Sequence, residues 1–218
     1  IDIYDPNGFK HIKVLDAVPD RVQRLEELKS RVDKRIMSWL IKNLIGEGNH
    51  QLVDDMFTSN DGTTVFVSRP SFADVIALNI HSGEIIWRTS IEGYRSDHAA
   101  ISPDGRPLIV SASTARKVHA IDTRSGDIIG GFPSGDRPHV NSFSQDGILI
   151  FHASIGRVYL PTSNRLLNYL KGDRYFQIVN ATNYEILQRI DMAKKLRDFG
   201  MPWHCLLYTS DAADARSS

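Results

Sequence analysis

The sequence predicts an all-β fold built from a repeated unit of four short strands. Turns of the Asp-Gly and Ser-Gly type separate short runs rich in Val, Ile and Phe, a pattern typical of antiparallel hairpins because glycine accepts a positive φ. The turn aspartate recurs as Asp61, Asp104 and Asp146, with a period of 43 and then 42 residues. A period of about 40–45 residues with four strands per unit is typical of propeller blades. We therefore expect an incomplete β-propeller of about three four-stranded blades plus part of another, about half of a seven-bladed ring, with one inter-blade amphipathic helix.

The unit is clearest in the middle of the chain, in SPDGRPLIVSASTARKVHAIDTRSGDIIGG. The second turn of each unit falls at Gly83, Gly126 and Tyr184, and the longer last step indicates an insertion of about 16 residues in the third unit. The predicted boundaries are a tail of a preceding blade at 1–17, a helical insertion at 18–48, blades at 49–96, 97–136 and 137–192, an insertion near 157–172, the start of an inter-blade connection at 193–204 and a non-native tail at 205–218.

The middle unit, extended to SPDGRPLIVSASTARKVHAIDTRSGDIIGGFPSG, resembles the YVTN-type β-propeller repeat in its Ser-Pro-Asp-Gly turn, its V-x-x-I-D-T strand and its Ser-Gly turn. IALNIHSGEIIWRTSI also resembles a repeat of the quinoprotein dehydrogenase propellers, which carry a Trp a few residues after the same turn. Trp87 has no counterpart in the other units, where Gly130 and Gln188 stand, and this departs from the quinoprotein pattern. The resemblance covers about Asp54 to Met192 and implies a fold more than a function, because such propellers host many activities.

Composition narrows the partners. The chain has 26 Lys and Arg against 26 Asp and Glu, so its zero formal charge favours neither nucleic acid nor an anionic membrane. No run of about 18 apolar residues is present, which predicts no membrane-spanning segment. We expect a small molecule or a protein as partner. Composition does not assign a compartment, and the family resemblance implies a periplasmic or extracellular location.

The two ends of the sequence stand apart from the repeats. Residues 1–17 match the second half of a unit, so we expect a fragment of a longer propeller. The ten residues from Cys205 to Asp214 resemble the translation of a sequencing adapter. On this interpretation the native sequence ends near His204 and the single cysteine is not native.

Between Pro19 and Ile45 the β pattern gives way to a helical one. Apolar residues recur there at steps of three and four, and charged residues occupy the opposite face. We expect the apolar face to pack on the propeller and the charges to be solvated; a helix that docks a partner is the alternative. The apolar positions are Val22, Leu25, Leu28, Val32, Ile36, Trp39 and Leu40, and the charged ones are Arg21, Arg24, Glu27, Arg31, Lys34 and Arg35.

Each unit carries polar residues just before its first strand, and these are the candidate site: Asp54 and Asp55, then Asp97 and His98, then His139. The first strand of a propeller blade lines the central channel, so these residues should converge at one mouth. Imidazole and carboxylate suit a divalent metal and also transfer protons. The alternative is that they cap strands and hold channel water.

Two further residues join the candidate site. Arg137 offers a guanidinium that suits an anionic ligand, or is simply solvated. His152 is aligned with Ser68 and Ser111 of the other units, where a side chain reaches either the channel or its own blade's loop. The insertion near 157–172 is a candidate lid over the channel, or an exposed loop.

Two functions remain open. The first is a ligand- or protein-binding module that uses its central channel mouth. The second is an oxidoreductase or hydrolase with a divalent metal or a quinone similar to PQQ, as the quinoprotein resemblance implies. The enzyme requires the Asp and His residues to lie within coordination or hydrogen-bonding reach of one another, and the binding module does not.

Overall fold

The structure is a computed structural model that describes residues 1–5, 7–30, 32, 33, 36, 39, 51–157 and 170–198. Predictions for residues 40–48, for most of the insertion near 157–172 and for the segment from 199 onward lie outside the described residues.

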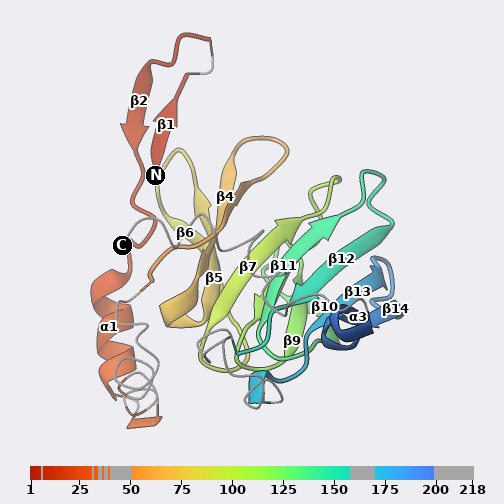
Figure 1. The fold of residues 1–218 in the computed structure, drawn as a ribbon. Coiled ribbons are helices and arrows are strands. Elements are labelled where there is room, and N and C mark those ends of the chain that lie inside the picture. Colours follow the sequence, from red (N-terminus) through yellow and green to blue (C-terminus); the bar gives the residue numbers. More distant parts are fainter. Residues whose placement is uncertain are drawn as a thin grey trace.

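Three four-stranded antiparallel sheets follow one another along the chain (Figure 1). The first contains β3 (Met56–Thr58), β4 (Thr64–Arg69), β5 (Asp74–Asn79) and β6 (Ile85–Ser90). The second contains β7 (Ser96–Ile101), β8 (Leu108–Ala112), β9 (Lys117–Ile121) and β10 (Ile128–Pro133). The third contains β11 (Pro138–Phe143), β12 (Leu149–Ser154), β13 (Tyr175–Asn180) and β14 (Ile186–Asp191).

Shorter elements flank these sheets. They are the β1 (Asp2–Tyr4) and β2 (His11–Val14) hairpin, helix α1 (Arg21–Ser30), the 3-10 turn η2 (Pro70–Phe72) and helix α3 (Met192–Asp198). In each large sheet the strands pair in chain order, and β7 contacts β3, β4 and β11 of the neighbouring sheets. Each sheet is therefore a propeller blade with its first strand innermost, and the predicted fold class is confirmed.

The repeated turns are alike in their hydrogen bonds as well as in their spacing. Asp61, Asp104 and Asp146 each accept a backbone N–H from two residues later, at 2.9–3.1 Å. The glycine after each aspartate has a φ between 68° and 81°, a conformation that side chains with a Cβ rarely adopt. The period in the sequence thus corresponds to the same hydrogen-bonded turn, repeated in each of the three blades.

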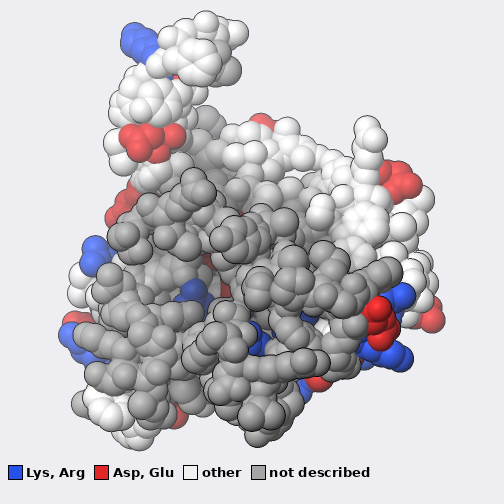
Figure 2. Space-filling model, viewed as in Figure 1, with Lys and Arg blue, Asp and Glu red and all other residues white. Residues whose placement is uncertain are grey.

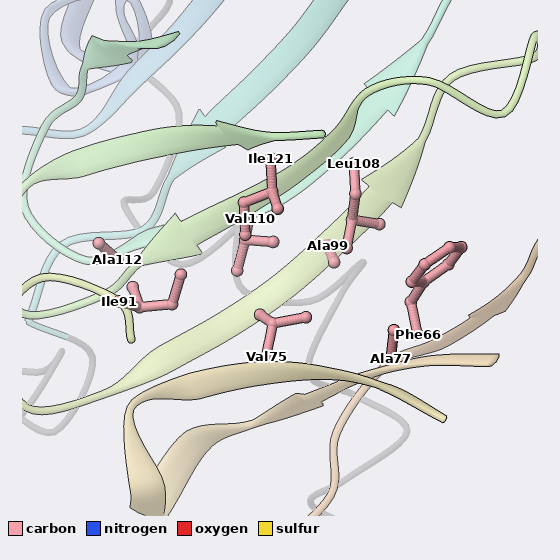
Figure 3. Packing of buried hydrophobic residues seen from close by; sticks show 9 residues of the cluster. All are labelled: Phe66, Val75, Ala77, Ile91, Ala99, Leu108, Val110, Ala112 and Ile121. Carbon is pink, nitrogen blue, oxygen red and sulfur yellow. The ribbon is translucent and has the colours of Figure 1, made fainter. Parts of the chain in front are cut away.

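Apolar clusters fill the spaces between blades. The cluster between the first and second sheets is shown in Figure 3 and contains Phe66, Val75, Ala77, Ile91, Ala99, Leu108, Val110, Ala112 and Ile121. On β8, Leu108 and Val110 face the first sheet, while Ile109 belongs to the next cluster along. Because successive side chains of a strand point to opposite faces, the apolar run of β8 serves two interfaces.

Bulky and small residues are matched across the two blade interfaces. Trp87 of the first blade packs on the Gly126 turn of the second, where an added Cβ would lie 2.7 Å from the indole. At the next interface Gly130 stands where Trp87 stands, and Tyr184 stands where Gly126 stands. An added Cβ at Gly130 would lie 2.3 Å from the Tyr184 ring. The missing tryptophan in the second unit is therefore offset by a tyrosine from the third.

The charged surface is mixed in sign. Figure 2 shows Lys and Arg interspersed with Asp and Glu around the edge of the face in view. This agrees with the zero net formal charge of the sequence.

Helix α1 confirms the predicted helix, but the predicted packing of its faces is wrong. Among its described residues the buried one is Arg24, which is 8% exposed, although it was assigned to the solvated face. Its guanidinium lies over the Phe72 ring, donates to the Phe72 carbonyl at 3.2 Å and lies 3.0 Å from the Asp74 carboxylate. The charged group of Arg24 thus anchors the helix, while the aliphatic part of the same side chain covers apolar surface.

A second arginine completes this anchor. Arg69 and Asp74 are both fully buried and pair at 2.7 Å, and Asp20, next to the helix, also accepts from Arg69 at 2.5 Å. Buried charges are tolerated when they are paired and hydrogen-bonded. Of the apolar positions predicted to pack on the propeller, Leu25 and Leu28 are half-buried, whereas four are 56–73% exposed: Val22, Val32, Ile36 and Trp39.

Replacing Gly130 by Ala should lower the free energy of unfolding by about 1–3 kcal/mol, because the new methyl group would overlap the Tyr184 ring. In a chain that already carries Tyr184→Gly, the Gly130→Ala substitution should lower the free energy of unfolding much less, because the ring that it would overlap is gone. Urea unfolding measures both effects. Gly8→Ala is the matched control, since nothing lies within 4 Å of a Cβ there; strictly additive losses in the double variant would refute the steric explanation.

Candidate functional site at the inner strands

The candidate residues lie on β-bulges of the innermost strands. In the first blade two residues, Asp54 and Asp55, lie opposite the single residue Ser68. The Asp54 N–H donates to the Ser68 carbonyl and the Ser68 N–H donates to the Asp55 carbonyl, each at 3.0 Å. The pairing of β7 with β8 shifts register between Ser96 and Ala99, and the pairing of β11 with β12 shifts register between Pro138 and Asn141. An extra residue in a strand re-aims the local side chains. The same distortion therefore occurs in all three blades, at the positions of the polar residues.

The neighbouring inner strands are joined by side-chain hydrogen bonds. Ser68 Oγ donates to the Asp97 carbonyl at 3.0 Å, and Ser111 Oγ donates to the His139 carbonyl at 2.8 Å. Asn141 Nδ2 adds bonds to Ser111 Oγ at 2.9 Å and to the His98 carbonyl at 3.1 Å. We call these the seam bonds. They fix the spacing between the inner strands of adjacent blades.

His98 is the centre of the site. Its Nδ1 lies 3.0 Å from Asp55 Oδ2 and 4.0 Å from Asp54 Oδ2. Asp97 Oδ1 accepts the His98 backbone N–H at 3.0 Å, and the His139 ring packs edge-on against the His98 ring with centroids 4.2 Å apart. We call Asp54, Asp55, Asp97, His98 and His139 the inner-strand cluster.

The cluster offers two overlapping sets of potential metal ligands, Asp97 with His98 and His139, and Asp54 with Asp55 and His98. Within each set the ligand atoms lie within 4.8 Å of one another. The structure thus brings together five of the seven candidate residues, from three different blades.

Electrostatics at the cluster favours a protonated His98. The hydrogen bond that His98 donates to Asp55 is the largest influence and, with the charges of Asp55, Asp54 and Asp97, raises the pKa of His98 to about 9 against the opposing effect of burial. Burial tends to raise the pKa of Asp55, but the bonds from His98 and the Ala99 N–H outweigh it and lower that pKa. Burial, with the nearby Asp97 and Asp55 charges, raises the pKa of Asp54. Three carboxylates therefore surround one imidazolium.

Substituting Asp55 by Asn should lower the pKa of His98 from about 9 toward its ordinary 6.5, because the main bond that holds the proton is weakened. NMR titration of the His98 ring in a chelating buffer measures this shift. In the unsubstituted chain, the stability from this pair is present below pH 6.5 and is lost as the pH rises through about 9. A His98 pKa that stays near 9 in D55N would contradict the assignment.

Arg137 lies immediately before β11, two residues from His139. Its backbone is left-handed, with a φ of 53°, and its carbonyl accepts the Ile155 N–H at 3.0 Å. The side chain is half-buried. Its role toward a ligand stays a prediction.

His152 does not belong to the inner-strand cluster, and its alignment with Ser68 and Ser111 is wrong by one residue. His152 pairs with Asn141, as Val110 pairs with Ala99, so it occupies the position of Val110. A shift of one residue along a strand turns a side chain to the other face. His152 accordingly points into the interface with the second blade, where it is fully buried.

Neutral partners hold His152 in that interface. Its Nδ1–H donates to Asn141 Oδ1 at 2.8 Å, and its Nε2 accepts the Ser134 hydroxyl at 2.7 Å. The Phe132 ring packs edge-on against it at 5.5 Å. Burial lowers the pKa of His152 to about 3. The chain of hydrogen bonds from Ser134 through His152 to Asn141 resembles the one in a hydrolytic triad. A fully buried imidazole of such low basicity is nevertheless a poor general base.

The burial of neutral His152 should make the chain less stable in mild acid. The unfolded histidine binds a proton below pH 6.5 while the folded one does not until about pH 3, so its contribution is complete above pH 6.5 and is lost as the pH falls. Between pH 7 and 4.5 this costs about 2–3 kcal/mol. Urea unfolding at both pH values gives the change in the free energy of unfolding for the unsubstituted chain and for His152→Gln. The difference between the two proteins isolates the effect of His152, because all other groups titrate in both proteins. Equal pH dependence in the two proteins would reject it.

Sequence reasoning missed the residues that make the seam bonds. Ser68 and Ser111 each follow the turn aspartate of their unit by seven residues, which is a detectable signal. Asn141 has no counterpart of this kind. Gln51, which donates to Asp54 Oδ1 at 2.9 Å, lies before the first strand of its blade, and no pattern in the sequence marks it.

Comparisons with known proteins agree with the fold. No family model matches the sequence, and no curated protein matches it. Among solved structures, the chain is similar to Kuenenia stuttgartiensis hydrazine synthase, with 20% identity, a TM-score of 0.53 and coverage of 67% of this chain and 39% of that one. It is also similar to the RRP9 WD40 repeats (12% identity, TM-score 0.52, 66% and 40% covered) and to U3-55K (14%, 0.50, 66% and 41%).

These likenesses show the fold alone. The chain spans about two fifths of the length of each of these structures. Together with the three blades they define a β-propeller. Among the described residues, no helix is long and apolar enough to cross a bilayer.

Proposed function

We propose that this chain is part of a YVTN-type β-propeller that acts as a binding module, and that the inner-strand cluster at its channel mouth holds a positively charged group of a small molecule or protein partner. One observation carries the proposal: the carboxylates of Asp55 and Asp97 and the imidazoles of His98 and His139 meet from three blades, with His98 in contact with Asp55 at 3.0 Å. Sequence-distant polar residues that converge on one point are typical of binding sites.

The charge of the cluster sets the kind of ligand. Three carboxylates, Asp54, Asp55 and Asp97, face two cations, His98 when protonated and the nearby Arg95, so the site keeps a net negative charge. These side chains are at least half-buried, where charges are screened less by water and salt than at the surface. An ammonium or guanidinium group would relieve the repulsion among the carboxylates.

A metal-dependent oxidoreductase or hydrolase is the second candidate. It is favoured by the two sets of potential metal ligands in the cluster, because imidazole and carboxylate are groups that hold a catalytic divalent metal. A quinone cofactor is supported by the sequence resemblance alone. Binding is preferred because it requires only the negative cluster and no reacting group.

The binding proposal is tested with a matched pair of probes, Nα-acetyl-L-arginine amide and its uncharged isostere Nα-acetyl-L-citrulline amide, called arginine amide and citrulline amide below. In a chelating buffer, arginine amide should shift the NMR signals of His98 and His139 saturably and citrulline amide should not. At pH 5.5, where His98 stays protonated even without Asp55, Asp55→Asn and Asp97→Asn keep a hydrogen-bond acceptor but remove a negative charge, and each should weaken binding about tenfold.

Asp127→Asn is the control, because Asp127 is an exposed turn residue outside the cluster. Equal responses to the charged and the neutral probe would count against the proposal, as would full affinity in both Asp55→Asn and Asp97→Asn.

A further inference from the structure

We propose that the inner-strand cluster binds one transition-metal dication of the zinc class, with Asp97, His98 and His139 as ligands and Asp55 as the carboxylate that orients His98. The inference rests on the proposed function in its use of the same negatively charged site, and it adds a metal dication to the kinds of cation that the site takes.

The spacing of the three ligands suits one ion. Their ligand atoms lie within 4.8 Å of one another. Atoms that share a zinc ion, each at about 2.0–2.2 Å, are separated by about 3–4 Å. Side-chain adjustments of about 1 Å are therefore sufficient to close the site. The ligands come from adjacent strands, β7 and β11, so both strands contribute to one coordination sphere.

The donor set selects the class of metal. Two imidazoles and a carboxylate suit zinc, cobalt and related ions, whereas magnesium and calcium prefer sites made of oxygen ligands. This favours the set with His139 over the overlapping set of Asp54, Asp55 and His98, which has a single nitrogen ligand.

Asp55 supplies the supporting contact that such sites use. A histidine that binds a metal commonly donates its other ring N–H to a carboxylate, which fixes the ring orientation. Asp55 Oδ2 contacts Nδ1 of His98 at 3.0 Å and is itself held by the Ala99 N–H at 2.9 Å. This arrangement leaves Nε2 of His98 for the ion.

The backbone is fixed before any ion arrives. The seam bonds hold the carbonyls of Asp97 and His139, at 3.0 Å and 2.8 Å, from two different blades. Asp97 is also 9% exposed, so its carboxylate has limited freedom. A preorganised site loses less conformational entropy when it binds.

Metal binding is measured on the full chain carrying Cys205→Ser, which removes the one thiol that would otherwise compete for the ion. After dialysis against chelator, Co²⁺ should bind one per chain with visible d–d absorption, and Zn²⁺ should displace it. Mg²⁺ and Ca²⁺ at the same concentration should not. Paramagnetic broadening by Co²⁺ should affect the ring signals of His98 and His139 first, a readout that needs no substitution.

Variants in the same background then test each role. His98→Ala and His139→Ala should weaken Co²⁺ binding by about 100-fold or more, and Asp55→Asn by about 10-fold. His81→Ala, at an exposed turn, is the matched control and should bind as the parent does. Unchanged affinity in both His98→Ala and His139→Ala would overturn the site, as would Mg²⁺ binding as tight as that of Co²⁺.

The two proposals fail separately. If arginine amide shifts His98 and His139 but Co²⁺ leaves their signals unbroadened, the metal site is rejected and the binding module stands. If neither probe acts on these rings, both proposals are rejected.

Discussion

The seam bonds are the constraint on which the site depends. A bulge in each inner strand turns polar side chains out of the sheet, but it also takes backbone groups out of the regular ladder. Buried carbonyls require a partner, and the serines of the preceding blade, Ser68 and Ser111, provide one for Asp97 and His139. The distortion that presents each site residue is thereby coupled to the contact that positions the next blade. Blade spacing and site geometry have a common cause.

Apolar packing and polar contacts have different tasks in this arrangement. The clusters between blades supply non-directional stabilisation, and they tolerate exchange of shape as long as volume is conserved, as the Trp87–Gly126 and Gly130–Tyr184 pairs show. Register is a directional property, and hydrogen bonds specify it. Helix α1 follows the same division, because the paired charges of Arg69 and Asp74 fix where it docks while several of its apolar side chains remain exposed.

The sequence predicted what repeats and failed where a contact is unique. Turn aspartates and glycines recur, so blade number and strand order could be predicted, and so could the convergence of Asp55, His98 and His139, since all three lie near the start of an innermost strand. His152 was misplaced because the apolar run gives the extent of a strand but not its pairing, and one residue decides the face. The burial of Arg24 depends on Asp74, fifty residues away and without a repeat, which no local pattern reveals.

The two histidines, His152 and His98, distinguish structure from function. His152 is fully buried, neutral and satisfied at both ring nitrogens by neutral groups, so folding alone accounts for it. His98 is one-third exposed and is surrounded by three carboxylates whose charge His98 and the nearby Arg95 together do not neutralise. Such an excess of like charge destabilises the folded chain, and a purely structural role would be served by one carboxylate. Local rules that are broken without a structural gain are expected at functional sites. A cation supplied from outside the chain removes the excess, and this is why the inner-strand cluster is better explained as a binding site than as a strand cap.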